Sequence, residues 1–375
     1  MNFELTNEQE VLRSAAEKFI ADEYDFTARQ KIAAGENGYS DKHWDAFRDL
    51  GWLSLGFEEA YGGFDDAAVE TMLLANAFGK GLIVEPFYST VVLGGSLLTG
   101  AASAEQKAAL IPDIIEGKTK LAFAYAEPDR RYDFADIETT AVREKDGYSL
   151  HGRKSVVFDA PHADYLIVTA YLEGANGLRL FLARNDAKGV SRRDYRTTDG
   201  RRASEIEFQS VRLDASSLLG GSNGDVAPVV EAAADRTTAV ACADAVGAME
   251  HLFQTTLEYL KTRKQFGTTI GSFQAIQHRM TELFVQLELA KSMSIYANLS
   301  LQSAPAERKK AVSQAKIEVI AAAQLIGRQA IQLHGGIGMT NEFHVGHFFK
   351  RLTAFESYLG DAGHHASRIE SLETA

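Results

Sequence analysis

Two short runs in the last third of the chain have the residue types that hold a phosphate-bearing cofactor. The first begins with Arg263-Lys264-Gln265-Phe266-Gly267, and the second is Gln332-Leu333-His334-Gly335-Gly336-Ile337-Gly338. An arginine can give forked hydrogen bonds to phosphate oxygens, and closely spaced glycines let the backbone approach a ligand. The alternative is that Arg263 is a surface cation at a helix end and that the glycines only stop a helix.

The composition limits the class of protein. The chain has 375 residues, a net charge of −12 and 45% hydrophobic residues, which is ordinary for a globular protein of two or three domains. An acidic balance argues against a nucleic-acid binder. The single cysteine, Cys242, excludes an intrachain disulfide and fits a reducing, cytoplasmic location. We find no signal peptide and no apolar run long enough to cross a membrane.

The hydrophobic pattern predicts three segments. Residues 1–118 have helical spacing, with capping-box patterns at Thr6 and Ser103. Residues 119–222 change to the alternation of short strands, which predicts a small barrel or sandwich. Residues 223–375 return to long amphipathic helices, which predict a helical bundle. The expected strands and helices are 121–125, 148–152, 154–158, 164–170, 178–183 and 204–208, then 237–262, 272–301, 306–334 and part of 341–371.

The two runs together resemble the flavin-binding signatures of the acyl-CoA dehydrogenase family, and the resemblance covers the whole chain. It implies the fold of that family: an N-terminal helical domain, a middle β-barrel and a C-terminal four-helix bundle. It also implies an FAD whose adenine-pyrophosphate half is held by a neighbouring subunit's side chains and glycines. The residues that match this role are Arg263, Gln265, Phe266, Gln274, Gln332, Gly335 and Gly336.

The resemblance is weaker at the flavin ring. The family usually has a threonine where Ala126 stands in Ala126-Glu127-Pro128, and that threonine helps to hold the ring. A tryptophan and a threonine of the family correspond to Val156 and Phe158. Either backbone amides do most of the work at this site, or this flavin face is degraded and a partner chain contributes the complete one.

The catalytic base is displaced from its usual place. The family's glutamate position corresponds to Gly360, with Asp361 one residue later, and the less common position on the first bundle helix corresponds to Thr237 and Thr238. Two candidate bases remain, Asp361 and Asp244. Asp244 lies among alanines, where an acid is costly unless it is paired. The alternatives are a structural pair for Asp244 and a helix N-cap for Asp361.

Two other polar clusters are interpreted as having no catalytic role. Adjacent histidines His364 and His365 point about 100° apart on a helix and lack a third ligand, so we reject a metal site. The arginines between Arg192 and Arg202 form the densest basic patch. They could meet CoA phosphates or an acidic partner surface, but a solvated loop is the interpretation that we favour.

Three functions fit these observations. The first is an FAD-dependent acyl-CoA dehydrogenase of fatty acid or dicarboxylate catabolism, which takes an acyl-CoA substrate and passes electrons to electron-transfer flavoprotein or a similar acceptor. The second is a non-catalytic or half-site small subunit that pairs with a related large subunit, as the nearest type, the pimeloyl-CoA dehydrogenase small subunit, implies. The third is a flavin-independent CoA-ester binding protein. We expect a homo- or hetero-oligomer, a dimer or tetramer, with neither nucleic acid nor membrane as partner.

Overall fold

The computed structural model describes residues 4–130, 132–221 and 224–374, so the expected boundary at residues 222–223 lies outside the described residues. The chain divides into two compact units. The first contains residues 1–31, 68–83 and 238–375, and the second contains residues 32–67 and 84–237. These units cut across the three expected sequence segments, whose boundaries therefore stay a prediction.

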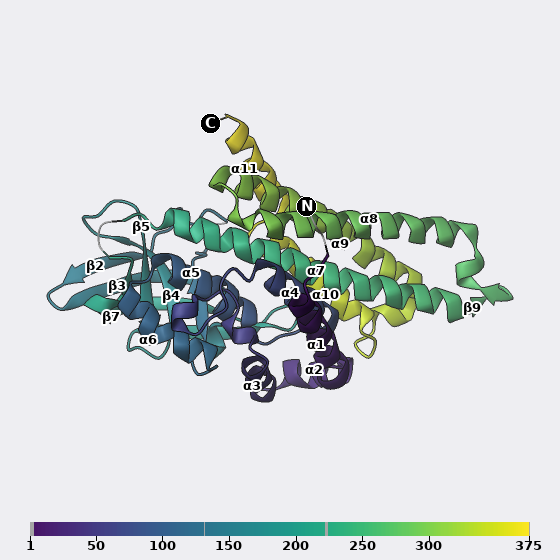
Figure 1. Cartoon of the computed structure of the whole chain (residues 1–375), viewed down its shortest axis with the longest axis horizontal. Coiled ribbons are helices and arrows are strands. Elements are labelled where there is room, and N and C mark those ends of the chain that lie inside the picture. The colour runs from purple at the N-terminus through teal and green to yellow at the C-terminus, as the bar shows by residue number, and fades with distance from the viewer. Residues whose placement is uncertain (1–3, 131, 222–223, 375) are drawn as a thin grey trace. The chain divides into compact units, whose positions relative to one another are not determined.

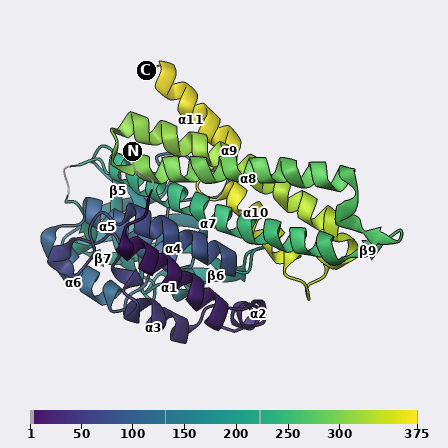
Figure 2. The same cartoon turned by 45° about the vertical axis from the view of Figure 1, so that its right-hand side comes forward.

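The first unit is helical. Its elements are α1 (Asn7–Glu23), the first part of α2 (Phe26–Ala34), α4 (Ala68–Gly81), the larger part of α7 (Ala227–Thr262), the hairpin strands β9 (Lys264–Gln265) and β10 (Thr268–Thr269), α8 (Gln274–Leu299), α9 (Pro305–His334), α10 (Val345–Ser357) and α11 (Ala362–Thr374). Helices α8 and α9 run side by side (Figures 1 and 2), and α9 also contacts α10 and α11. The expected bundle helices are present, but α7 starts ten residues earlier than predicted, and the last expected helix is two helices separated at Gly360.

Local sequence explains where these helices begin and touch. Thr6 caps α1 through the predicted box with Gln9. Pro305 is the first residue of α9, where its missing N–H costs nothing. Helices α4 and α7 cross with their backbones in contact, because a Cβ at Gly79 would lie 1.9 Å from the Asp244 carbonyl oxygen. A larger residue at Gly79 would force the helices apart.

The second unit combines short helices with a β-sheet. Its helices are α3 (Asp41–Asp49), a π-helix (Tyr88–Gly94), α5 (Gly95–Ala101) and α6 (Ala104–Ile115). Its strands are β1 (Leu121–Ala124), β2 (Thr140–Glu144), β3 (Gly147–Phe158), β4 (Tyr165–Leu172), β5 (Leu178–Arg184), β6 (Val190–Arg196), β7 (Arg202–Asp214) and β8 (Leu218–Leu219). The predicted Ser103–Gln106 capping box opens α6.

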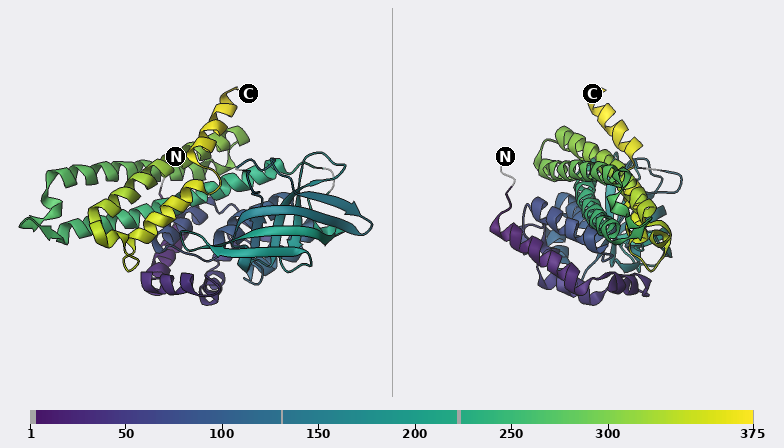
Figure 3. Two further views of the ribbon diagram at one scale, coloured as in Figure 1. Left: turned by 180° about the vertical axis from the view of Figure 1, so that it is seen from behind. Right: turned by 90° about the vertical axis from the view of Figure 1, so that its right-hand side faces the viewer.

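The strands form one sheet, which confirms the predicted middle β domain. The strand order is β6-β7-β3-β2-β4-β5-β8, and β1 pairs with β4. The long strands lie side by side in the view from behind (Figure 3, left). The two strands expected at 148–152 and 154–158 are one strand, β3, in which the register against β7 shifts between Leu150 and Gly152 and again between Lys154 and Val157. Such irregularities interrupt the alternation, which is why the pattern appeared to break.

Strand β6 corrects the interpretation of the basic patch. Arg192, Arg193 and Arg196 lie on this edge strand, and not in a loop. Charged side chains on an edge strand discourage pairing with another chain. Arg202 also has an internal role, since its guanidinium donates to the Gly35 carbonyl oxygen at 2.6 Å.

A buried ionic network fixes the segment after β1. The Lys154 ammonium donates to Glu127 Oε1 at 2.8 Å and to Thr169 Oγ1 at 2.8 Å, and Thr139 Oγ1 donates to the same Glu127 oxygen at 2.6 Å. Burial lowers the pKa of Lys154 to about 8. Because these four side chains hydrogen-bond to one another, this network has the features of a structural anchor.

Candidate active site

The first run folds into a hairpin that joins α7 to α8. Phe266 and Gly267 occupy its two-residue loop with φ values of 54° and 80°, the left-handed pair that a tight hairpin of this kind requires. The backbone N–H of Ile270 donates to the Arg263 carbonyl oxygen at 2.9 Å and closes the hairpin. Phe266 is 92% exposed, although its ring contacts Phe273 at a centroid distance of 6.3 Å. A phenylalanine held this far out from its own chain suits contact with another molecule.

The second run lies at the same end of the bundle as this hairpin. Helix α9 ends at His334, and Gly335 takes φ 67° and ψ −143°, a conformation that favours glycine. The Tyr259 ring, one turn before the end of α7, stacks on the His334 ring at 4.4 Å. The Tyr259 hydroxyl also donates to the His334 carbonyl oxygen at 3.3 Å. This contact joins the end of α7, where the first run begins, to the second run.

The exposed groups of the two runs suit contact with phosphate oxygens, and their assignment to a cofactor stays a prediction. Arg263, Gln332, Gly335 and Gly336 are exposed. A Cβ added at Gly267, Gly335 or Gly336 would meet no atom within 4 Å, so the backbone here faces open space. Within the described part of the chain, the Arg263 guanidinium has no hydrogen-bond or ion-pair partner. Gln265 and Gln274 are exposed beside it, at β9 and at the first position of α8.

We predict that Arg263→Ala lowers the FAD content of the purified protein. The substitution removes a charge-assisted contact to phosphate of about 1.5–3 kcal/mol. The measurement is the ratio of flavin to protein absorbance after gel filtration. Lys264→Ala, which removes a neighbouring exposed cation, is the matched control and should keep its flavin. Equal flavin content in both variants would contradict the assignment of Arg263.

The positions expected near the flavin ring lie in the second unit. Ala126 is half-buried, and its carbonyl oxygen accepts from the Ser155 N–H at 2.8 Å. Val156 is 45% exposed and has φ 49°, a strained conformation for a β-branched residue. The Arg201 guanidinium lies 4.7 Å from the centre of the Phe158 ring. None of these three side chains can donate a hydrogen bond to a ligand.

Asp244 has the geometry of a structural pair. Arg351 from α10 donates through Nε to Asp244 Oδ1 at 3.0 Å and through Nη2 to Oδ2 at 2.8 Å. Both side chains are buried, with 5% and 8% of their side-chain surfaces exposed. The alternative that the sequence left open, a structural pair, is therefore present, and the partner is an arginine. A base needs a free oxygen directed at its substrate, and here each oxygen accepts from the guanidinium.

Asp361 has the geometry of a helix cap. Its Oδ1 accepts from the His364 N–H at 2.9 Å, and its carbonyl oxygen accepts from the His365 N–H at 3.1 Å at the start of α11. This N-cap is the second alternative that the sequence left open. Asp361 is half-buried. Its Oδ2 is not used in the cap, so Asp361 stays a candidate, but one with a structural role.

At Gly360, any side chain would be strained and would clash with two imidazole rings. Its φ is 123°, which L-residues rarely adopt, and a Cβ added there would lie 2.6 Å from His364 Cδ2 and 2.7 Å from His365 Nε2. The two imidazoles therefore take the space in which a side chain at residue 360 would begin. A glutamate at this position would require both the backbone and the histidines to move.

A buried lysine holds the segment before Gly360. The Lys316 amine from α9 donates to the carbonyl oxygens of Phe355 at 2.6 Å and Tyr358 at 3.0 Å, at the end of α10. Complete burial lowers the pKa of Lys316 from 10.5 to about 7. Lys316 was not among the candidate residues from the sequence. A signal was available, because Lys316 follows the buried Val312 by four residues on the apolar face of α9.

We predict that the stability of the protein rises between pH 7 and pH 9 because of Lys316. The unfolded lysine keeps its proton up to about pH 10.4, whereas the folded one loses it near pH 7. The unfolded state then binds more protons, so unfolding becomes less favourable as pH rises, by up to about 1.4 kcal/mol per pH unit. Lys316→Met should flatten the urea-unfolding profile over this range, and Lys310→Met, on an exposed face of the same helix, should not. A profile that is equally steep in Lys316→Met would contradict this account.

The histidine pair and the described acidic groups provide no metal site. No group of three or more metal-ligating side chains occurs among residues 4–130, 132–221 and 224–374. His365 is buried, its Nδ1 lies 3.1 Å from Ser313 Oγ, and burial lowers its pKa to about 2. Over the same described ranges, no helix is both long and apolar enough to cross a membrane.

Comparison with known proteins assigns the family. The N-terminal, middle and C-terminal domain models of acyl-CoA dehydrogenase match residues 6–118, 122–211 and 227–371. The probable acyl-CoA dehydrogenase YngJ of Bacillus subtilis (strain 168) is 29% identical over 384 residues, covering 100% of this chain and 99% of that protein.

Solved structures agree in fold. PigA, solved with FAD and proline, has a TM-score of 0.91 and 25% identity, covering 100% of this chain and 99% of PigA. A chain of the ChsE4-ChsE5 complex from Mycobacterium tuberculosis has a TM-score of 0.90 and 23% identity, covering 100% of this chain and 99% of that one. At this identity the similarity shows the fold alone. With all three domain models matched in order, the chain belongs to the acyl-CoA dehydrogenase family.

Proposed function

We propose that the chain works as an FAD-dependent acyl-CoA dehydrogenase that forms one half of a two-subunit enzyme. The reaction removes a proton alpha to the thioester and a hydride from the beta carbon of an acyl-CoA. FAD, when bound, supplies the hydride acceptor. The observation that carries the two-subunit proposal is Gly360, where a side chain at the family's usual base position has no room.

This chain's own contribution is to bind and orient the cofactor. Arg263 offers two parallel N–H donors to phosphate oxygens. Phe266, Gln332 and the backbone at Gly335 and Gly336 form an open face beside it. Because this face is open in the isolated chain, it would hold the phosphate half of an FAD whose remaining part is bound by a neighbouring chain.

Proton abstraction is assigned to the partner chain. Asp244 is occupied by Arg351, and Asp361 caps α11. Ala126, Val156 and Phe158 offer no side-chain hydrogen bond to a flavin ring. The ChsE4-ChsE5 complex, which has the same fold, is itself an assembly of two named components. A second, related large subunit with a carboxylate base would complete the site.

An apolar surface on the bundle supports an oligomer. Several large apolar side chains along α8 are 39–50% exposed: Phe284, Val285, Leu289, Tyr296 and Leu299. Leu325 on α9 is 38% exposed. Since α8 and α9 lie side by side, these side chains can be covered by another bundle. We propose a dimer or tetramer packed through this surface, and light scattering that finds a monomer would contradict it.

The remaining parts of the proposal follow the family resemblance. Electrons pass to electron-transfer flavoprotein or a similar acceptor, and the acyl group belongs to fatty acid or dicarboxylate catabolism. Cys242 is free and buried, which fits a reducing compartment such as the cytoplasm.

A spectrum of the purified chain tests the flavin requirement. We expect visible flavin absorbance, or binding of added FAD, and then slow or absent bleaching when a panel of acyl-CoAs is added without oxygen. A chain that binds acyl-CoA but neither contains nor takes up FAD would instead be a flavin-independent CoA-ester binding protein. That result would overturn the proposed function.

A further inference from the structure

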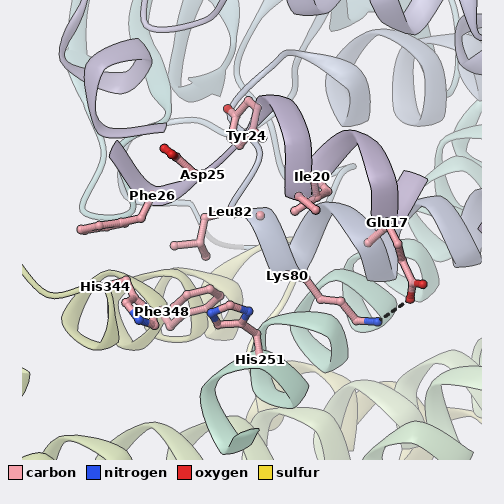
Figure 4. Close-up of a pocket in the computed structure, with 13 residues that line it drawn as sticks. Glu17, Ile20, Tyr24, Asp25, Phe26, Lys80, Leu82, His251, His344 and Phe348 are labelled. Carbon is pink, nitrogen blue, oxygen red and sulfur yellow. Dashed lines mark hydrogen bonds and ion pairs between the residues drawn. The ribbon is translucent and has the colours of Figure 1, made fainter. Parts of the chain in front are cut away.

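The first unit contains a cavity that is separate from every residue assigned above. Its volume is about 500 Å³ and it lies among α1, α4, α7 and α10 (Figure 4). It shares no lining residue with the hairpin, with the glycine run or with the Gly360 segment. Its size falls within the usual range of small-molecule sites, which is roughly 300–1,000 Å³.

One side of this cavity is made of stacked aromatic rings. The His251 ring lies parallel to the Phe348 ring, with a centroid distance of 4.6 Å and an interplanar angle of 15°. His344 meets His251 edge-on at 5.3 Å, and Phe26 lies 5.7 Å from His344. Figure 4 shows His251, Phe348 and His344 on one side of the space and Leu82 and Ile20 on the other. Such a set of rings offers planar faces and edges to another planar ring.

The imidazoles in this wall are uncharged at neutral pH. Burial lowers the pKa of His344 to about 4, helped by repulsion from His251, His334 and His347. Burial and the nearby Lys80 lower the pKa of His251. His344 Nδ1 is buried and has no hydrogen-bond partner among the described residues. An unsatisfied buried nitrogen costs about 1–3 kcal/mol, which a ligand's donor or acceptor would offset.

The rim of the cavity has an excess of negative charge. Lys80 is held by Glu17 at 3.0 Å and by Glu250 at 3.5 Å, so its charge is already neutralised. Asp25 adds another carboxylate to the lining. This balance disfavours a ligand that carries phosphates or a carboxylate.

The opposite wall contains a strained residue. Leu82 has φ 55° at the end of α4, and its carbonyl oxygen accepts from Arg29 Nε at 3.3 Å. A non-glycine residue in this conformation costs of order 1–3 kcal/mol, and such residues often occur where a ligand is clamped. The strain places the Leu82 side chain in the cavity wall, facing the ring stack.

We propose that this cavity is a second binding site for a planar aromatic or heteroaromatic molecule that has no negative charge. The ring inserts between the His251–Phe348 stack and Leu82. A polar ring atom of the ligand bonds the free nitrogen of His344. The cavity shares no lining residue with the runs assigned to FAD or with the Gly360 segment, so we assign its occupant as an effector or a second substrate.

Binding of small ring compounds tests this proposal. Indole, quinoline and adenine are titrated into the full-length protein by calorimetry and by saturation-transfer NMR. We expect at least one of them to bind, with indole-3-acetate at least about tenfold weaker than indole because of the acidic rim. Failure of all three neutral rings to bind, or equal binding of the anion, would overturn the proposal.

A variant that places a larger side chain in the cavity tests where the compound binds. Ala21 lines the mouth of the cavity on an exposed part of α1. Ala21→Phe should therefore lower the affinity for the bound compound at least about tenfold without disturbing the core. Ser14→Phe adds the same ring at an exposed position of α1 outside the cavity and is the matched control. Equal binding in Ala21→Phe and Ser14→Phe, with unchanged helix content in both, would place the compound elsewhere and reject this site.

Discussion

Co-expression of this chain with its related large subunit should raise acyl-CoA dehydrogenase turnover at least about tenfold over the chain alone. Such a rise corresponds to about 1.4 kcal/mol of transition-state stabilisation. The physical reason is that the chain offers a cofactor-binding face but no free carboxylate at the positions where the family places a base. The measurement is steady-state turnover per flavin with an artificial electron acceptor. Full turnover by a flavin-replete homo-oligomer of this chain alone would contradict the prediction.

The variant Gly360→Glu distinguishes two causes of low activity in the chain alone: the lack of a catalytic carboxylate and the lack of a partner subunit. If the chain lacked only the acid, Gly360→Glu would restore activity to the chain alone. We expect no recovery, because residue 360 has φ 123° and its Cβ would meet the rings of His364 and His365. Circular dichroism establishes that the variant is folded before turnover is compared. Recovery of turnover in Gly360→Glu would show that the segment can rearrange and would remove the argument for a second chain.

Asp244→Leu should destabilise the protein by about 3–5 kcal/mol in urea unfolding. The substitution removes the carboxylate that accepts two hydrogen bonds from the buried Arg351 guanidinium, and removing one partner is the costly way to break a buried pair. The double variant Asp244→Leu/Arg351→Met removes both charges and should regain most of the loss. If Asp244 had only a catalytic role, the second substitution would not restore the free energy of unfolding.

The conservative variant Asp244→Asn distinguishes the two roles further. An amide keeps the shape of the side chain but loses the charge that Arg351 requires, so we expect lower stability and unchanged flavin reduction in the assembled enzyme. Wild-type stability with abolished flavin reduction would make Asp244 the base and would contradict the structural assignment.

Much of the fold follows from local patterns in the sequence. The capping residues Thr6 and Ser103 start their helices as predicted, because caps depend on a few adjacent residues. Helices were expected in the segment from residue 223 onward, but the first ten residues of α7 fall outside the expected helix 237–262, since a helix end that is held by packing leaves little local signal. Strand β6 was missed because its polar arginines do not alternate with apolar residues.

The candidate site was predicted only where its residues are close together in the sequence. Arg263, Phe266 and the glycines stand in contiguous runs, so their types and spacing could be recognised. Partners from distant segments could not be, which is why the roles of Arg351 and Lys316 appeared only in three dimensions. For Asp244 and Asp361, a catalytic and a structural role were both open from the sequence, and the contacts in three dimensions favour the structural one.

The most direct test of the two-subunit account is flavin bleaching in the co-purified complex when this chain carries Asp361→Asn. Acyl-CoA is added without oxygen, and the visible flavin absorbance is followed. If the base belongs to the partner chain, bleaching by Asp361→Asn should match that of the unmodified complex in both rate and extent. Loss of bleaching, with FAD and acyl-CoA still bound, would place the base on this chain and contradict the account.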